Sequence, residues 1–138
     1  MATKLLCTHY NNPGNIRSVT GKPWIGEIEN GKHHFCHFSK IEYGFRAMNR
    51  LLIHYITRLY LTTIFDIINR WAPPIENDTS SYISMVCDFM NFDKFDTVTE
   101  EHIPEIIAAI TCVEQGFSTD HYEKILRDIK TYSANKQL

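Results

Sequence analysis

Residues 99–116 read TEEHIPEIIAAITCVEQG, and this stretch decides the fold class. Thr99 precedes Glu100 and Glu101, and carboxylates in a first helical turn interact favourably with the positive end of the helix dipole. Apolar side chains then recur every three or four residues, which is typical of a helix packed on a core. Gly116 is a common helix stop, because glycine adopts the left-handed conformation without steric cost. The stretch therefore predicts a core helix that ends near Gly116.

Further helices are predicted on both sides of this stretch from the same periodicity and from end signals. The first runs to about Leu59 and begins at Ser39, where Ser39 and Glu42 form a capping-box pattern. The second ends at Ala72, because a residue before proline avoids helical angles and Pro73 has no N–H to donate. The expected starting positions are Ser39, Thr62 or Thr63, Asn77 to Thr79, and Ser118.

The first 38 residues have a different character, rich in turn formers. Asn30-Gly31 separates the alternating runs 24–28 and 34–38, a strong signal for a β-hairpin. Residues 11–15 (NNPGN) predict a loop. We therefore expect a mainly α, α+β fold of about five helices and one small hairpin, in a single domain spanning 1–138. Its parts are a loop and hairpin (1–38), a helical region (39–132) and a tail (133–138).

Composition excludes several function classes. The chain has 138 residues and a formal net charge of -2, without the clustered basic residues that nucleic-acid binding requires. No apolar run resembles a signal peptide or a transmembrane helix, so we expect synthesis in the cytoplasm and no membrane partner. No Gly-rich phosphate-binding motif occurs, and no cofactor is expected.

The cysteines and histidines do not indicate a metal site. Cys7, Cys36, Cys87 and Cys112 form no C-x-x-C pair, which favours free thiols. A group of histidines surrounds Cys36 at positions 33, 34 and 37, but alternation along a strand sends neighbours to opposite faces. No metal is therefore expected.

Glu114 is the most informative position in the predicted core helix. At 100° per residue it falls near the centre of the apolar stripe, away from Glu101 and Glu105. Apolar surroundings disfavour the charged form of a carboxyl group, so the position suits a general acid. The alternative is that Glu114 turns out to solvent or pairs with Arg46. The stripe consists of Ile103, Ile106, Ile107, Ile110 and Val113.

A sugar-binding groove is the site chemistry that the loops suggest. Glycoside cleavage commonly uses a second carboxylate, and Glu27, Glu76 and Asp78 are the loop candidates, although each is also explained as a cap, a turn residue or a surface charge. Aromatic rings beside amide side chains are typical of sugar sites; core packing explains Trp71 equally well. The candidate binding residues are Asn11, Asn12, Asn15, Trp24, Glu76 and Asn77.

Several long strings resemble a family of phage and prophage virion-associated proteins. They are residues 11–17 (NNPGNIR), 24–26 (WIG), 42–48 (EYGFRAM) and 67–79 (IINRWAPPIENDT), followed by Tyr82. The resemblance covers roughly residues 10 to 90. It implies phage or prophage origin and a place in or on the virion, with other virion or delivery-machine proteins as partners.

A wider similarity is to lysozyme-like glucosaminidases and transglycosylases, which cut the glycan strands of peptidoglycan. In that family a helix delivers the catalytic Glu, and an Asn-containing loop, a Trp-x-Gly hairpin and a later helix with a tyrosine follow. Residues 12–16, 24–26 and Tyr82 resemble the later parts. Residues 109–117 (AITCVEQGF) resemble the catalytic helix moved to the C-terminal side, as a circular permutation would place it. Gln115 stands where many relatives carry Ser.

These resemblances imply a lysozyme-like enzyme acting on peptidoglycan glycan strands, by hydrolysis or as a lytic transglycosylase. Glu114 is then the general acid, Tyr82 its catalytic partner, and Asn12, Trp24 and Glu76 line the groove. The enzyme would be virion-associated or delivered to the periplasm or cell wall. One alternative is a non-catalytic virion or wall-binding protein, and another is a delivered antibacterial toxin with the same chemistry.

Overall fold

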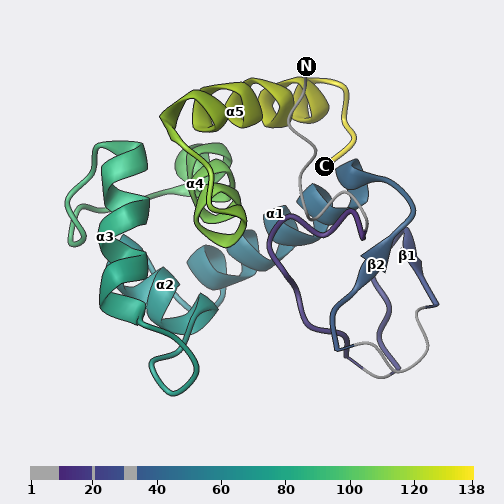
Figure 1. The fold of residues 1–138 in the computed structure, drawn as a ribbon, viewed down its shortest axis with the longest axis horizontal. Helices are drawn as coiled ribbons and strands as arrows, with labels where there is room; N and C mark the ends of the chain where they lie inside the picture. Colours follow the sequence, from purple (N-terminus) through teal and green to yellow (C-terminus); the bar gives the residue numbers. More distant parts are fainter. Residues whose placement is uncertain (1–9, 20, 30–33) are drawn as a thin grey trace.

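The computed structural model describes residues 10–19, 21–29 and 34–138, and Figure 1 shows their arrangement. Within these residues, helices predominate and a small antiparallel sheet lies at one end, as predicted. No helix of the described chain is both long and apolar enough to cross a membrane. The helices are α1 (Ile41–Thr57), α2 (Ile64–Trp71), α3 (Thr79–Met90), η2 (Glu100–His102), α4 (Ile103–Gln115) and α5 (Thr119–Ala134).

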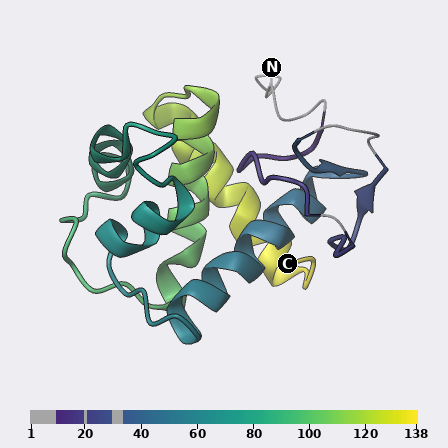
Figure 2. The same ribbon diagram turned by 90° about the horizontal axis from the view of Figure 1, so that it is seen from below.

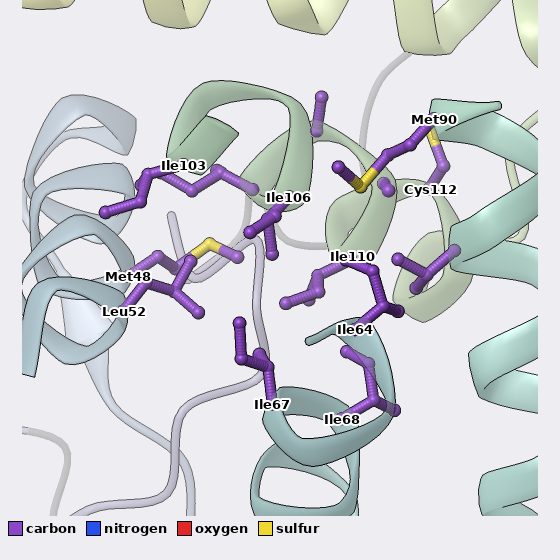
Figure 3. Packing of buried hydrophobic residues seen from close by; sticks show 14 of the residues in the cluster. Met48, Leu52, Ile64, Ile67, Ile68, Met90, Ile103, Ile106, Ile110 and Cys112 are labelled. Carbon is purple, nitrogen blue, oxygen red and sulfur yellow. The ribbon is translucent and has the colours of Figure 1, made fainter. Parts of the chain in front are cut away.

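Helix α4 is the centre of the fold. It packs against α1, α3 and α5, and most of its residues are buried on every side. A helix that is apolar all round belongs in a core, which explains why residues 103–113 carry so few polar side chains. Figure 2 shows α4 among its neighbouring helices. Figure 3 shows Ile106 and Ile110 facing the side chains of α1 and α2. The predicted core helix is confirmed.

The helix ends follow the predicted signals at most positions. Thr63 caps α2 by accepting a hydrogen bond from the Asp66 amide at 3.1 Å. Asp78 caps α3 by accepting from the Ser81 amide at 3.2 Å. Gly116 ends α4 with a φ of 69°, in the left-handed region that glycine adopts freely.

The predicted capping box at Ser39 and Glu42 is wrong. Helix α1 begins at Ile41 after Lys40, and no side chain caps it. The Ser39 amide instead donates to the Gly26 carbonyl at 2.9 Å, which continues the pairing of the hairpin. The Ser39 backbone therefore extends the pairing of the hairpin, whereas the local sequence pattern predicted Ser39 as the cap of the helix.

The hairpin consists of β1 (Glu27–Ile28) and β2 (His37–Phe38), paired with Glu27 opposite Phe38 and Ile28 opposite His37. The predicted pairing of these two segments is confirmed. Asn30-Gly31 lies outside the described residues.

The Asn12 side chain ties the loop before the hairpin to Ile16 and to Cys36. This side chain is 1% exposed, and its amide donates to the carbonyls of Ile16 and Cys36 while its oxygen accepts from the Ile16 amide. Buried amide groups that are fully hydrogen-bonded fix the backbone around them. Asn12 therefore sets the course of residues 12–16, which lead toward α4.

Close contact between this loop and α1 requires Gly44. A Cβ at Gly44 would overlap the carbonyl oxygen of Asn11 and lie 2.6 Å from the Pro13 Cδ. We expect Gly44→Ala to displace the loop and to lower the free energy of unfolding by about 1–3 kcal/mol, as measured by urea denaturation. The control is Arg50→Ala on the exposed face of the same helix. Equal stability of the two variants would contradict the close packing.

Candidate active site

Glu114 joins three separate parts of the fold. It lies in the last turn of α4, where its side chain is half-buried. Its Oε2 accepts a hydrogen bond from the Tyr82 hydroxyl of α3 at 2.7 Å. Its Oε1 accepts one from the side-chain amide of Asn15, in the N-terminal loop, at 2.8 Å. The alternative that Glu114 turns to solvent or pairs with Arg46 is therefore wrong. The structure brings together three residues that the sequence singled out.

Tyr82 is the buried member of this cluster and is 6% exposed. Burial, then the charge of Glu114 and the hydrogen bond to it, raise the pKa of Tyr82 well above its ordinary value, and a hydrogen bond with the Trp71 side chain opposes this rise. The phenol thus stays protonated and donates to Glu114. This chain of contacts holds the carboxylate in one orientation.

Asn15 is the exposed member. It has a φ of 49°, in the left-handed region that asparagine tolerates better than most residues. The backbone of the Asn12 loop holds Asn15 in this conformation, since the backbone N–H of Asn15 donates to the backbone carbonyl of Asn12 at 3.2 Å. One side of Glu114 thus faces a side chain in contact with solvent, and the other faces the core.

A hollow of about 210 Å³ has Asn15 in its wall, while Glu114 is not among the residues that line it. Trp71 forms part of its wall and lies edge-on to Tyr55 at a ring distance of 6.3 Å. A Cβ at Gly14 would lie 2.9 Å from the Trp71 ring, so glycine allows the loop to pack against the indole. The wall is formed by Gly14, Asn15, Ile16, Arg17, Leu51, Tyr55 and Trp71.

The remaining predicted binding residues lie elsewhere or have local partners. The Asn11 amide donates to the Phe38 carbonyl at 2.9 Å, and the Asn77 amide to the Pro73 carbonyl at 3.3 Å. Trp24 precedes β1, and its backbone amide donates to the Glu27 carboxylate at 2.9 Å. Among the predicted binding residues, Asn15 contacts Glu114. Asn12 contributes by holding the backbone of Asn15.

The candidate second carboxylates also have other partners. Glu27 accepts from the Trp24 amide, and Asp78 accepts from the Ser81 amide and hydroxyl at the start of α3. Glu76 pairs with Arg17, one of the residues that line the hollow, at 3.6 Å. Glu76 is therefore the candidate nearest to the hollow.

Sequence reasoning missed Arg17 and Tyr55 as lining residues. Arg17 lies directly after the turn-forming loop, and its guanidinium lies 5.6 Å from the Phe35 ring centroid. Tyr55 is on the buried stripe of α1, where periodicity explains it fully as a core residue. A basic residue beside a loop of amide side chains was the one available signal.

The described cysteines are free thiols, as predicted for Cys36, Cys87 and Cys112. Cys7 lies outside the described residues. Burial raises the pKa of Cys112 to about 12, and burial together with Glu27 raises the pKa of Cys36 to about 12. These two side chains stay protonated near neutral pH and are poor nucleophiles.

The raised pKa of Tyr82 predicts a loss of stability at high pH. Above about pH 10 the unfolded chain loses the Tyr82 proton while the folded chain retains it. The unfolded state then binds fewer protons, so the free energy of unfolding falls as pH rises. We expect Tyr82→Phe to reduce this slope by up to about 1.4 kcal/mol per pH unit. Urea denaturation between pH 9 and 11 measures it.

The control is Tyr60→Phe, since Tyr60 is exposed. This variant should keep the slope of the wild type. An unchanged slope in Tyr82→Phe would show that Tyr82 does not hold its proton in the folded state.

Chemically, the arrangement is a carboxyl group fixed by two hydrogen bonds beside a polar hollow. A group held in this way exchanges a proton with a ligand in a defined position. Tyr82 and Asn15 hold the Glu114 carboxyl group in place, and Asn15 also lines the hollow.

Comparison with known proteins gives one informative result. No protein-family model matches the chain. Protein P5 of Pseudoalteromonas phage PM2 is 36% identical to it over 118 residues, which cover 83% of this chain and 74% of Protein P5.

Proposed function

This chain belongs to the family of Protein P5 of phage PM2, and on that premise we propose that it is a phage virion-associated enzyme that cleaves the glycan strands of peptidoglycan. The observation that carries the proposal is the Glu114 cluster, in which α4, α3 and the N-terminal loop meet at one carboxyl group. The cluster joins three of the parts by which the sequence resembles lysozyme-like enzymes: residues 12–16, Tyr82 and residues 109–117.

The order of the parts supports a circularly permuted lysozyme-like site. In the resemblance, the helix bearing the acid precedes an Asn-containing loop. Here α4 follows that loop in the chain, yet its last turn contacts Asn15 across 99 residues of sequence. The tyrosine on a later helix corresponds to Tyr82, which contacts the other oxygen of the same carboxyl group.

In the proposed reaction, Glu114 donates its proton to the glycosidic oxygen as the bond from that oxygen to the sugar carbon breaks. The positive charge that develops on the sugar ring is stabilised by the Glu114 carboxylate and the Tyr82 hydroxyl. A hydroxyl of the sugar itself or a water molecule then attacks the ring carbon and returns its proton to Glu114. Attack by the substrate's own group needs no second carboxylate, whereas attack by water commonly uses one as a base.

A non-catalytic virion protein is the second candidate. Both oxygens of Glu114 already accept a hydrogen bond from the protein, and such contacts also serve to lock the N-terminal loop against α3 and α4. In this case the cluster only stabilises the fold, and its partners are other virion proteins.

Turbidity loss of purified peptidoglycan, with mass analysis of the released fragments, distinguishes the two candidates. The enzyme should solubilise the glycan, and anhydro or reducing ends identify transglycosylation or hydrolysis. A folded protein that releases no fragments would favour the non-catalytic candidate.

A further inference from the structure

Arg17 has a carboxylate partner at the mouth of the hollow. The Arg17 guanidinium lies 3.6 Å from the Glu76 carboxylate, with the two side chains 61% and 51% exposed. Arg17 also lines the hollow whose wall includes Asn15, the partner of Glu114. An exposed pair of this length is weak, so another carboxylate replaces Glu76 at little cost.

A second guanidinium, from Arg70 of α2, lies against one of the residues that line the hollow. The Arg70 guanidinium lies 5.9 Å from the centroid of the Tyr55 ring, and its side chain hydrogen-bonds the Tyr55 hydroxyl. Tyr55 lines the hollow together with Arg17. Arg17 is therefore the charged residue in the wall of the hollow, and Arg70 adds positive charge next to another wall residue, Tyr55.

We propose that this hollow is a subsite for a carboxylate carried by the glycan, with Arg17 as its principal ligand. The guanidinium group binds a carboxylate through two parallel hydrogen bonds, a geometry that gives selectivity as well as affinity. In the structure the Arg17 guanidinium pairs with the Glu76 carboxylate. The substrate carboxylate displaces Glu76 from Arg17. The inference rests on the proposed function and narrows its substrate.

The consequence is a preference for acid-bearing glycans over neutral ones. The muramic acid unit of peptidoglycan carries a carboxylate on its lactyl group or, when a peptide is attached, on that peptide. A polymer of N-acetylglucosamine has the same backbone linkage and no carboxylate. The neutral polymer has no carboxylate to displace Glu76 from Arg17, so Arg17 adds nothing to its binding free energy.

Binding of three soluble oligosaccharides to wild type and Arg17→Gln tests the proposal. The ligands are a peptide-free peptidoglycan oligosaccharide, its peptide-bearing form, and an N-acetylglucosamine oligomer of equal length. We expect Arg17→Gln to weaken binding of the carboxylate-bearing ligands by about 2- to 5-fold, the usual contribution of an exposed ion pair, and to leave the neutral ligand unchanged. The peptide-free ligand distinguishes the lactyl carboxylate from a peptide carboxylate.

Matched variants make the result specific. Arg127→Gln removes an exposed arginine on α5, which lies along the top of Figure 1 while α2 lies near the bottom. It should bind like the wild type. Arg70→Gln should weaken carboxylate binding less than Arg17→Gln, because Arg70 acts next to Tyr55 rather than in the wall itself.

Binding is measured separately from cleavage, so the two proposals fail separately. Carboxylate-selective binding that depends on Arg17, without glycan release, overturns the enzyme and retains the subsite. Glycan release with equal binding of acidic and neutral ligands, or equal losses for both in Arg17→Gln, overturns the subsite and retains the enzyme. Absence of binding by all three ligands also overturns the subsite.

Discussion

Glu114→Gln is expected to lower the rate of glycan release by about 10²- to 10⁴-fold, the usual contribution of a positioned proton donor. Glutamine keeps the shape of the side chain, but its one oxygen accepts from either Tyr82 or Asn15 while its NH2 group faces the other. The proton that the leaving oxygen requires is absent. Initial rates of fragment release from purified peptidoglycan measure the effect.

The control is Glu105→Gln on the same helix, where Glu105 pairs with Lys130 at 3.8 Å. This variant should release fragments at the wild-type rate. Equal rates for wild type and Glu114→Gln, with both proteins folded by circular dichroism, would remove Glu114 from the mechanism.

Ile106→Ala is expected to lower the free energy of unfolding by about 2–5 kcal/mol. Ile106 is 0% exposed and lies in the middle of the core that α1, α2 and α4 share (Figure 3). Truncation removes apolar contacts on several sides and leaves a cavity that a close-packed interior fills only in part. Since domains of this kind are stable by about 5–15 kcal/mol, the loss is a large share of the total. Urea denaturation measures it.

Ile75→Ala supplies a matched control for the same chemical change. Ile75 is 92% exposed, so its truncation should alter the free energy of unfolding by less than about 0.5 kcal/mol. If Ile106→Ala is no less stable than Ile75→Ala, α4 does not form the centre of the core.

The sequence predicted the helices well because their signals are local. Ile103 to Val113 repeat with helical spacing, and Gly116 ends the run as predicted. Thr63 and Asp78 are caps whose side chains reach amides three residues ahead. Contacts between residues three or four apart depend on the local sequence alone, so they can be predicted without knowledge of the tertiary fold.

Ser39 shows where local reasoning fails. Its spacing to Glu42 satisfies the capping-box pattern, yet the Ser39 amide pairs with the Gly26 carbonyl. A distant strand decides this contact, and nothing within residues 39–42 reveals it. Helix α1 consequently starts at Ile41.

The candidate site was predictable in part. Periodicity placed Glu114 against the core, and the resemblance brought Tyr82 to the same site. The contact between Asn15 and Glu114 joins positions 99 residues apart, and only the path of the loop over Gly44 brings them together. Arg17 of the loop and Tyr55 of α1 line one hollow because the loop packs beside the helix, and the spacing of these residues along the chain does not predict that contact.

If Glu114 is the general acid, a glycan strand binds with its scissile bond at the Glu114 side chain. The most direct measurement is the crystal structure of Glu114→Gln with a peptidoglycan oligosaccharide long enough to span the hollow and the Glu114 side chain. We predict a glycosidic oxygen within about 3 Å of the residue 114 side chain, and a sugar against Trp71 in the hollow. A glycan bound elsewhere, with residue 114 still held only by Tyr82 and Asn15, would contradict the account.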